Sequence, residues 1–249
     1  MVGRRMEPRG DTFDPRGWRM SVKDNLERVR ERIERAAVRA GRAPDEITIV
    51  AITKTHGPHV VEEAIRAGIE DIGENRIQEF LRKAEAVGLP CRWHLVGHLQ
   101  TNKVNKAVGR FALVHPVDSI RLAEKLAAAS EQRGITTEVL CEVNTSGEES
   151  KYGFRPGETP EACAEIAGLA GLRLRGLMTV GPWVSDRSVV TEAFVTLRRL
   201  RERIERESGG DIQLPHLSMG MTDDFEIAIA EGSTIVRLGR VLFGEREGY

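Results

Sequence analysis

The feature that most constrains the fold of this sequence is a repeated alternation of short apolar runs with longer amphipathic stretches. The first run, 47–53 (ITIVAIT), is β-branched and short enough for a buried strand. Further runs lie at 71–74, 92–97, 112–118, 138–144, 174–180, 214–219 and 234–238. Parallel strands need crossovers of about a dozen residues, which helices usually supply. Eight strand–helix units predict an α/β fold, a (β/α)8 TIM barrel, with an open doubly wound sheet as the alternative.

An additional helix is predicted before the first strand. Ser21 is its expected cap and Gly41 its expected end. Its apolar face is formed by Val22, Leu26, Val29, Ile33 and Ala37. Residues 1–19 lack apolar periodicity and are rich in glycine, proline and arginine, so we expect a flexible tail there and a single barrel domain over 20–249. A translation start at Met20 is the alternative explanation of this boundary.

Composition excludes several functional classes. The chain has 37 Lys+Arg and 38 Asp+Glu, and this balance argues against a general nucleic-acid binder. The three cysteines, Cys91, Cys141 and Cys163, are far apart and predict neither disulfides nor a zinc ribbon, so a cytoplasmic location is expected. No apolar run approaches the roughly 20 residues of a membrane span. His94 and His98 are four residues apart but lack a third ligand at suitable spacing, so no metal is expected.

Polar residues gather at the carboxyl ends of the predicted strands. In a (β/α)8 barrel the strand interiors are apolar, and the chemistry is found at this end. A single lysine at a strand end is usually a solvated charge, but several polar residues on one rim indicate a ligand site. The candidates are Lys54, Asn75, His94, Asn144, Met178, Thr179, Ser218 and Arg237.

Lys54, directly after the first predicted strand, has the most distinctive chemistry of these candidates. Loss of solvent and nearby cations both favour the neutral amine, which attacks an aldehyde to form a Schiff base. A salt bridge between Lys54 and Glu74 at the rim is the structural alternative.

Glycine-bounded loops follow the seventh and eighth predicted strands, in HLSMGMTDD (216–224) and IVRLGR (235–240). These are the usual phosphate-binding loops of a barrel. Ser218 and the amides near Gly239 and Arg240 are candidates to bind a phosphate, since glycine lets the backbone approach its oxygens closely. Ordinary turn glycines are the alternative. Together with Lys54, the loops predict a phosphorylated carbonyl ligand.

At the level of motifs the chain resembles the pyridoxal phosphate (PLP) homeostasis proteins, the YggS/PROSC family. The matching segments are AITKTH (51–56), IGENRIQE (72–79), WHLVGHLQTNK (93–103), VDS (117–119), EVNTSGEESKYGF (142–154), LRGLMTVGP (174–182), LSMGMTDDFEIAIAEGSTIVRLG (217–239) and LFGER (242–246). The resemblance implies a PLP-binding barrel of fold type III, like the N-terminal domain of alanine racemase without that enzyme's β-domain.

The resemblance also implies a set of cofactor-binding residues. Lys54 is the lysine that forms the internal aldimine with PLP, and Arg237 faces the pyridine nitrogen. Ser218 contacts the phosphate. The other implied positions are Asn75, His94, Met178, Met219, Gly220, Gly239 and Arg240. Two positions depart from the commoner pattern: Arg76 replaces a tyrosine, and Arg240 replaces a small hydroxyl residue, so that here the phosphate is expected to meet an amide or a guanidinium.

A cation beside the pyridine nitrogen disfavours protonation of the ring and weakens it as an electron sink. Racemisation needs an acid–base group on each face of the substrate, and the racemase β-domain that supplies one has no counterpart here. We therefore expect a monomeric, non-catalytic protein that holds PLP and supports vitamin B6 homeostasis and supply to PLP apoenzymes. A PLP-dependent amino-acid racemase and a Schiff-base aldolase acting on a phosphorylated sugar are the alternatives, and turnover with alanine or serine discriminates between the classes.

Overall fold

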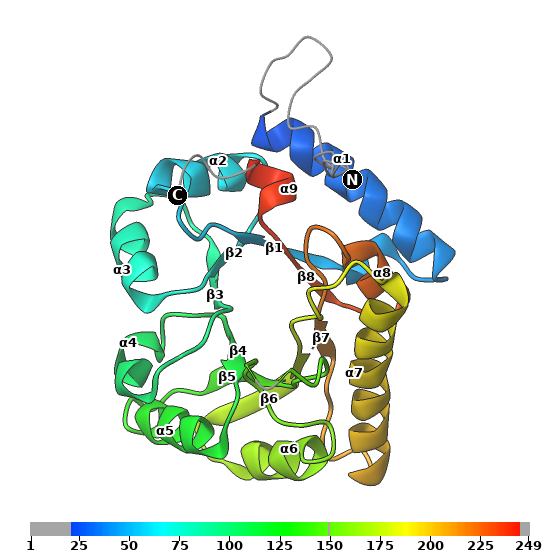
Figure 1. Cartoon of the computed structure of the whole chain (residues 1–249). Helices are drawn as coiled ribbons and strands as arrows, with labels where there is room; N and C mark the ends of the chain where they lie inside the picture. The colour runs from blue at the N-terminus through cyan, green and yellow to red at the C-terminus, as the bar shows by residue number, and fades with distance from the viewer. Residues whose placement is uncertain (1–20, 149, 245–249) are drawn as a thin grey trace, which may run out of the picture.

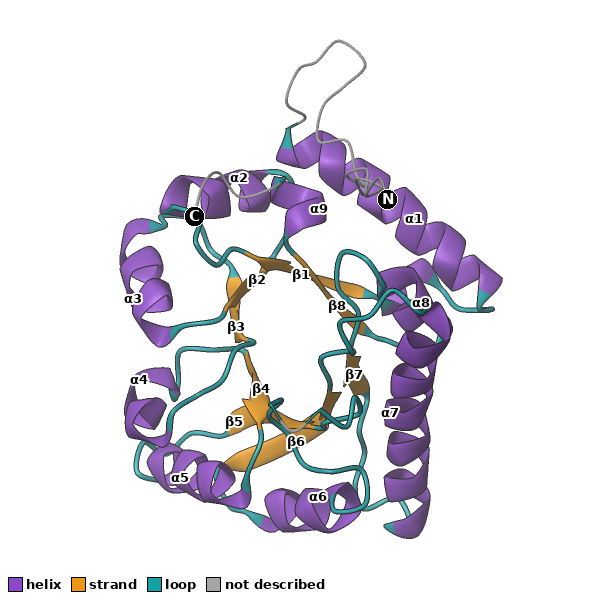
Figure 2. Ribbon diagram, viewed as in Figure 1, coloured by secondary structure: helices purple, strands orange, loops and turns teal. Residues whose placement is uncertain are grey.

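The computed structural model describes residues 21–148 and 150–244, and the predicted tail over residues 1–19 lies outside them. Its strands form one closed, all-parallel barrel in which each strand pairs with the next and β8 returns to β1 (Figure 2). The strands are β1 (Thr48–Ile52), β2 (Asp71–Glu74), β3 (Arg92–Leu95), β4 (Leu113–Val117), β5 (Thr137–Glu142), β6 (Leu172–Met178), β7 (His216–Ser218) and β8 (Ile235–Leu238). The predicted (β/α)8 barrel is confirmed, and the open sheet is wrong.

Helices surround the barrel as an outer ring (Figure 1). They are α1 (Val22–Arg39), α2 (Pro58–Arg66), α3 (Ile77–Ala86), α4 (Val104–Ala107), α5 (Ile120–Glu131), α6 (Thr159–Gly168), α7 (Arg187–Glu207), α8 (Phe225–Ala230) and α9 (Arg240–Phe243), with short 3-10 turns at Pro44–Glu46 and Thr101–Lys103. One turn of helix, α9, follows β8. No helix among these combines the length and apolar character needed to cross a membrane.

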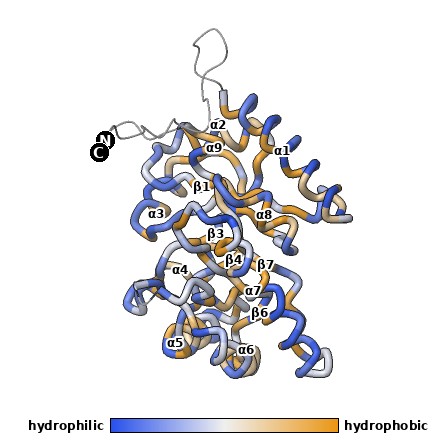
Figure 3. The backbone as a smooth tube through the Cα atoms, turned by 45° about the vertical axis from the view of Figure 1, so that its right-hand side comes forward, coloured by the Kyte–Doolittle hydropathy of each residue, from blue (hydrophilic) through white to orange (hydrophobic). Residues whose placement is uncertain are grey.

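Of these helices, α1 is the exception, because it lies outside the ring and packs against α8 and α9, beside the closure between β8 and β1. The side chain of Ser21 accepts a hydrogen bond from the Asp24 amide, and Asp24 reciprocates, so the predicted cap is a capping box. Gly41 lies just beyond the last turn with a φ of 69°, which confirms the predicted end. Figure 3 shows hydrophilic and hydrophobic residues alternating along α1, as expected of a helix with one buried face. The side chain of Asn25 donates to the carbonyl of Leu242 in α9, 2.9 Å away.

Residues of each strand alternate between the helix layer and the barrel interior, as the pleat requires. An apolar cluster fills the middle of the interior: Val50, Ile52, Leu113, Leu140, Met178 and Ile235. Gly73 makes room for this cluster, because a Cβ there would lie 2.5 Å from the Ile52 side chain. Inward-facing polar residues lie above and below the cluster, and they form the site described next.

Candidate functional site

The end of β1 is held in place by a buried ion pair. Lys83 of α3 donates to a Glu74 carboxylate oxygen at 2.5 Å and to the Thr53 carbonyl at 2.6 Å, and the Thr53 hydroxyl donates to the same Glu74 oxygen at 2.5 Å. Thr53 and Glu74 face the helix layer, and Lys54 follows Thr53 in the turn that leaves β1. The alternative in which Glu74 pairs with Lys54 is wrong, because its buried cationic partner is Lys83.

Lys54 is half-buried and lies in a constrained turn. Thr55 has a φ of 70°, a left-handed conformation that is uncommon for a β-branched residue. Its amide donates to a carboxylate oxygen of Glu79 in α3, 2.9 Å away. Helix α3 therefore fixes both the residue before Lys54 and the residue after it.

Arg237 in β8 brings a buried cation to the same end of the barrel. Its side chain is buried, and β8 lies beside β1 with Arg237 in register with Val50. The guanidinium donates to the Ser218 hydroxyl and to the Thr179 carbonyl, both at 2.7 Å. Burial lowers the pKa of Arg237 to about 10, which leaves it a cation at neutral pH.

A chain of hydrogen bonds leads inward from Arg237 across the barrel. The Ser218 hydroxyl lies 2.9 Å from Nδ1 of His115, whose Nε2 lies 3.0 Å from Nδ1 of His94. Nε2 of His94 lies 2.9 Å from a carboxylate oxygen of Asp71. All five side chains are buried. We call Arg237, Ser218, His115, His94 and Asp71 the barrel relay.

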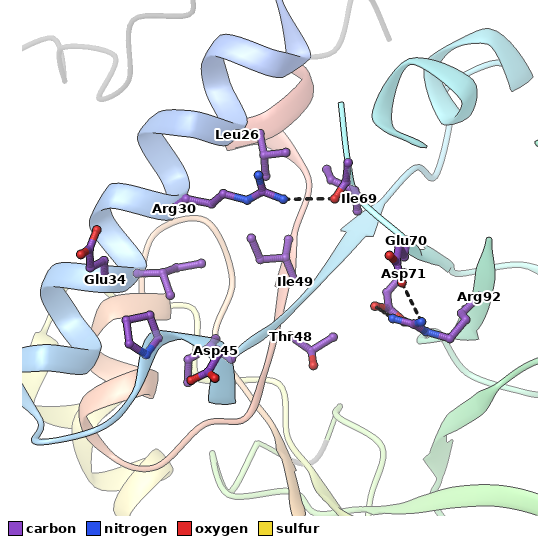
Figure 4. Close-up of a pocket in the computed structure, with 14 residues that line it drawn as sticks. Leu26, Arg30, Glu34, Asp45, Thr48, Ile49, Ile69, Glu70, Asp71 and Arg92 are labelled. Atoms are coloured by element: carbon purple, nitrogen blue, oxygen red, sulfur yellow. Dashed lines mark hydrogen bonds and ion pairs between the residues drawn. The ribbon is translucent and has the colours of Figure 1, made fainter. Parts of the chain in front are cut away.

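The barrel relay ends near the opposite mouth of the barrel. Arg92 donates to both carboxylate oxygens of Asp71, at 2.6 and 2.8 Å (Figure 4). Burial opposes ionisation of Asp71, but the hydrogen bonds from His94 and Arg92 outweigh it and lower its pKa to about 2. Asp71 and Arg92 line a cavity of about 490 Å³ between α1 and the amino ends of the strands.

Glu142, at the end of β5, supplies a carboxyl group with an altered proton affinity. One of its oxygens is buried without a hydrogen-bond partner among the described residues. Burial and, to a lesser extent, repulsion by Asp118 raise its pKa to about 7, against the attraction of Arg237. It lines a cavity of about 150 Å³ together with Asn144 and Lys151. This carboxyl can gain or lose a proton near neutral pH.

The loop after β7 closes over β8. Its Gly220 has a φ of 95°, and a Cβ there would lie 2.6 Å from the side chain of Ala228, so only glycine fits. The Gly220 carbonyl accepts from the Arg237 amide at 2.9 Å. At the surface Arg240 pairs with Asp223 of this loop. The residues predicted to surround a phosphate therefore lie on two connected loops beside Arg237.

Four other positions predicted at the rim have different surroundings in the structure. Asn75 follows β2 and is half-buried, whereas Met178 is almost fully buried in the apolar cluster of the interior. Asn144 uses its amide to hold its own loop, donating to the Glu148 carbonyl at 2.8 Å. The Thr179 hydroxyl donates to the Val143 carbonyl at 2.7 Å.

Sequence reasoning missed His115, Glu142 and Asp71 as parts of the site. His115 lies in β4 and is fully buried within the barrel relay. The signal that would have found these residues is strand parity. Each stands at an inward-facing position of its strand, where a polar side chain needs a partner.

Comparisons with known proteins bear on the family and the fold of this chain. The family model for the alanine racemase N-terminal domain matches residues 24–247. The pyridoxal phosphate homeostasis protein of Aquifex aeolicus is 42% identical over 229 residues, which cover 92% of this chain and 100% of that protein. That of Escherichia coli K12 is 37% identical, with 91% of this chain and 97% of that protein covered.

Two solved structures are informative. PipY of Synechococcus elongatus, with PLP bound, superposes with a TM-score of 0.79 at 31% identity, covering 90% of this chain and 100% of that chain. Alanine racemase of Clostridium difficile superposes with a TM-score of 0.72 at 15% identity, covering 92% of this chain and 57% of the enzyme. The second likeness is one of fold alone.

Proposed function

This chain belongs to the pyridoxal phosphate homeostasis protein family, and from that premise we propose that it binds pyridoxal 5'-phosphate at the carboxyl end of its barrel, with Lys54 as the covalent attachment point. One observation carries the proposal. A half-buried lysine follows the carboxyl end of β1, and the neighbouring strand β8 carries a buried guanidinium near its own carboxyl end. An aldehyde and a heteroaromatic nitrogen are the groups that such a pair suits.

The residues present fit the cofactor group by group. The amine of Lys54 suits the aldehyde, which it binds as a Schiff base. Arg237 is fixed by two acceptors and suits an unprotonated pyridine nitrogen. Loops 219–224 and 239–240, containing Met219, Gly220, Gly239 and Arg240, suit the phosphate. We assign the lining positions beside the ring to Asn75 and, in the barrel interior beneath it, to His94 and Met178.

The proposed role is to hold and release the cofactor without turnover. When bound, PLP supplies an electron sink whose strength depends on protonation of its ring nitrogen. Arg237 remains a cation at neutral pH, so it opposes a proton on the group that faces it. The site therefore favours retention of the aldehyde over carbanion chemistry. We further propose that the protein is a cytoplasmic monomer whose recipients are PLP-dependent apoenzymes.

The test of attachment is an absorption spectrum of the protein with PLP, before and after borohydride. We expect an imine band in the wild type that borohydride traps on the peptide containing Lys54. Lys54→Ala should lose the band. Lys151→Ala is the matched control, because Lys151 is another half-buried lysine near the rim, where it donates to the Gly181 carbonyl at 3.0 Å. A band that persists in Lys54→Ala, or none in the wild type, would overturn the proposal.

One observation favours a second candidate function, an amino-acid racemase. Glu142, with its pKa raised to about 7 by burial, is able to exchange a proton inside the same end of the barrel. Incubation of the PLP-loaded protein with L-alanine or L-serine, followed by chiral chromatography, separates the two candidates. The holding role predicts no D-isomer above the level produced by free PLP, whereas racemisation abolished in Glu142→Gln would establish the enzyme.

A further inference from the structure

The barrel relay contains four hydrogen bonds, and its two ends decide which atom donates in each. At the rim the guanidinium of Arg237 has only donors, so it donates to the oxygen of Ser218. At the other end Asp71 is ionised, because its pKa is lowered to about 2, and can only accept. His94 must therefore present Nε2–H to Asp71.

The two histidines between these ends complete one direction. Burial is the largest cause that lowers the pKa of His115 well below its usual value, so this ring is neutral and carries one N–H. In the arrangement that needs no extra proton, His94 carries its single hydrogen on Nε2, and its Nδ1 accepts from Nε2–H of His115. Nδ1 of His115 then accepts from the hydroxyl of Ser218. In each of the four hydrogen bonds of the barrel relay, the donor is then the residue nearer the rim and the acceptor is the residue nearer Asp71.

The opposite direction needs one extra proton. If His94 carried a hydrogen on both nitrogens, it would donate to His115, which would then donate to Ser218 and release the hydroxyl hydrogen. That proton would add a cation to an interior that already holds Arg237 and Arg92, with His216 also facing the histidines. Asp71, the carboxylate that pairs with His94, already accepts two hydrogen bonds from Arg92.

We propose that Ser218 and His115 are positioning residues for Arg237, and that the hydroxyl hydrogen of Ser218 is directed at His115 and not at the phosphate. This inference rests on the proposed function in one respect, namely that Arg237 faces the pyridine nitrogen of the bound cofactor. The oxygen of Ser218 and the carbonyl of Thr179 are the two acceptors that orient the guanidinium. The relay keeps the lone pairs of the Ser218 oxygen toward Arg237, because the hydroxyl hydrogen is donated to Nδ1 of His115.

The direction of the relay is measurable without any ligand. Two-bond ¹H–¹⁵N spectra of histidine-labelled protein at neutral pH distinguish the ring tautomers, and His94→Asn and His115→Asn assign the signals. We expect both rings to carry hydrogen on Nε2 and none on Nδ1. A hydrogen on Nδ1 of His115 would overturn the proposal, whatever the protein binds.

The role of Ser218 is measured with two ligands that differ only in the phosphate, pyridoxal 5'-phosphate and pyridoxal. Loss of a hydrogen bond to a charged group weakens binding by about tenfold. We expect Ser218→Ala to weaken both ligands by that factor and leave their affinity ratio unchanged. A loss confined to the phosphorylated ligand would make Ser218 a phosphate ligand and overturn the proposal.

Matched variants separate positioning from a general loss of packing. His115→Leu should reproduce Ser218→Ala with both ligands, whereas His115→Asn retains an acceptor near the place of Nδ1 and should recover most of the affinity. Ser130→Ala is the control, because its buried hydroxyl bonds to Thr137 at 2.7 Å outside the relay. If the wild type binds neither ligand, the proposed function fails, while the tautomer spectra still decide the direction of the relay.

Discussion

At the scale of the single residue, Glu142 couples folding to pH. Its unfolded pKa is near 4.5, and burial raises the folded value to about 7. Between these values the folded chain retains a proton that the unfolded chain has lost, so stability falls as the pH rises through this window. The full penalty, about 3 kcal/mol, applies above pH 7.

Glu142→Gln is predicted to remove this pH dependence. A neutral amide has no proton to retain, so the ligand-free variant should be more stable than the wild type at pH 8 and similar to it at pH 4.5. Denaturant unfolding at several pH values between 4.5 and 8 checks the prediction. The matched control is Glu148→Gln on the exposed loop nearby, which should keep the wild-type slope. Parallel profiles for Glu142→Gln and the wild type would contradict the assignment.

Single residues also mark what the sequence did not reveal. Lys54 and Arg237 were identifiable because they lie at the carboxyl ends of predicted strands and belong to recognisable motifs. The partners of His115 were not, since Ser218 lies 103 residues away in the chain and His94 lies 21 residues away. Which of two lysines pairs with Glu74 was likewise undetermined until α3 placed Lys83 against it. Contacts of this kind depend on barrel closure, and no local pattern encodes them.

At the scale of the element, the ion pair between Lys83 and Glu74 fastens α3 to the ends of β1 and β2. Removing one partner of a buried pair leaves an uncompensated charge and costs about 3–5 kcal/mol. Lys83→Met is therefore predicted to lower the free energy of unfolding by that amount, as measured by chemical denaturation. Because Lys83 also holds the Thr53 carbonyl, PLP attachment to Lys54 should weaken in the same variant.

A second substitution distinguishes lost pairing from lost packing. Lys83→Met combined with Glu74→Leu removes both charges and should recover most of the stability. Arg66→Met is the comparison, because its pair with Glu62 is exposed and should matter little. If the double variant is no more stable than Lys83→Met alone, the stabilisation does not come from the buried charges.

The order and type of the strands and larger helices followed from the sequence, because period-2 and period-3.6 patterns reflect one buried face. Their ends did not. The strand predicted at 214–219 is only His216–Ser218, since pairing with its neighbours decides where a ladder stops. Helix α9 is one turn long, too short to display a period.

At the scale of the whole molecule, β8 is the closing strand of the barrel, paired with both β7 and β1. Ending the chain after Gly232 removes β8, α9 and the guanidinium of Arg237. We predict that this variant loses cooperative thermal unfolding, because β1 then loses one of its two paired strands and α1 loses its contacts with α9. Circular dichroism melting and limited proteolysis check the outcome. A sharp transition in the shortened chain would show that the remaining strands close without β8.

The closure of β8 onto β1 has a consequence for the order of events on the ribosome. The apolar face of α1, with Leu26 and Val29, is covered by Phe225, Val236 and Leu242 near the other end of the chain. Synthesis proceeds from the amino end, so this face leaves the exit tunnel long before its cover is made. The nascent chain therefore exposes part of the apolar face of α1 during translation, and the barrel can close only after β8 has left the ribosome.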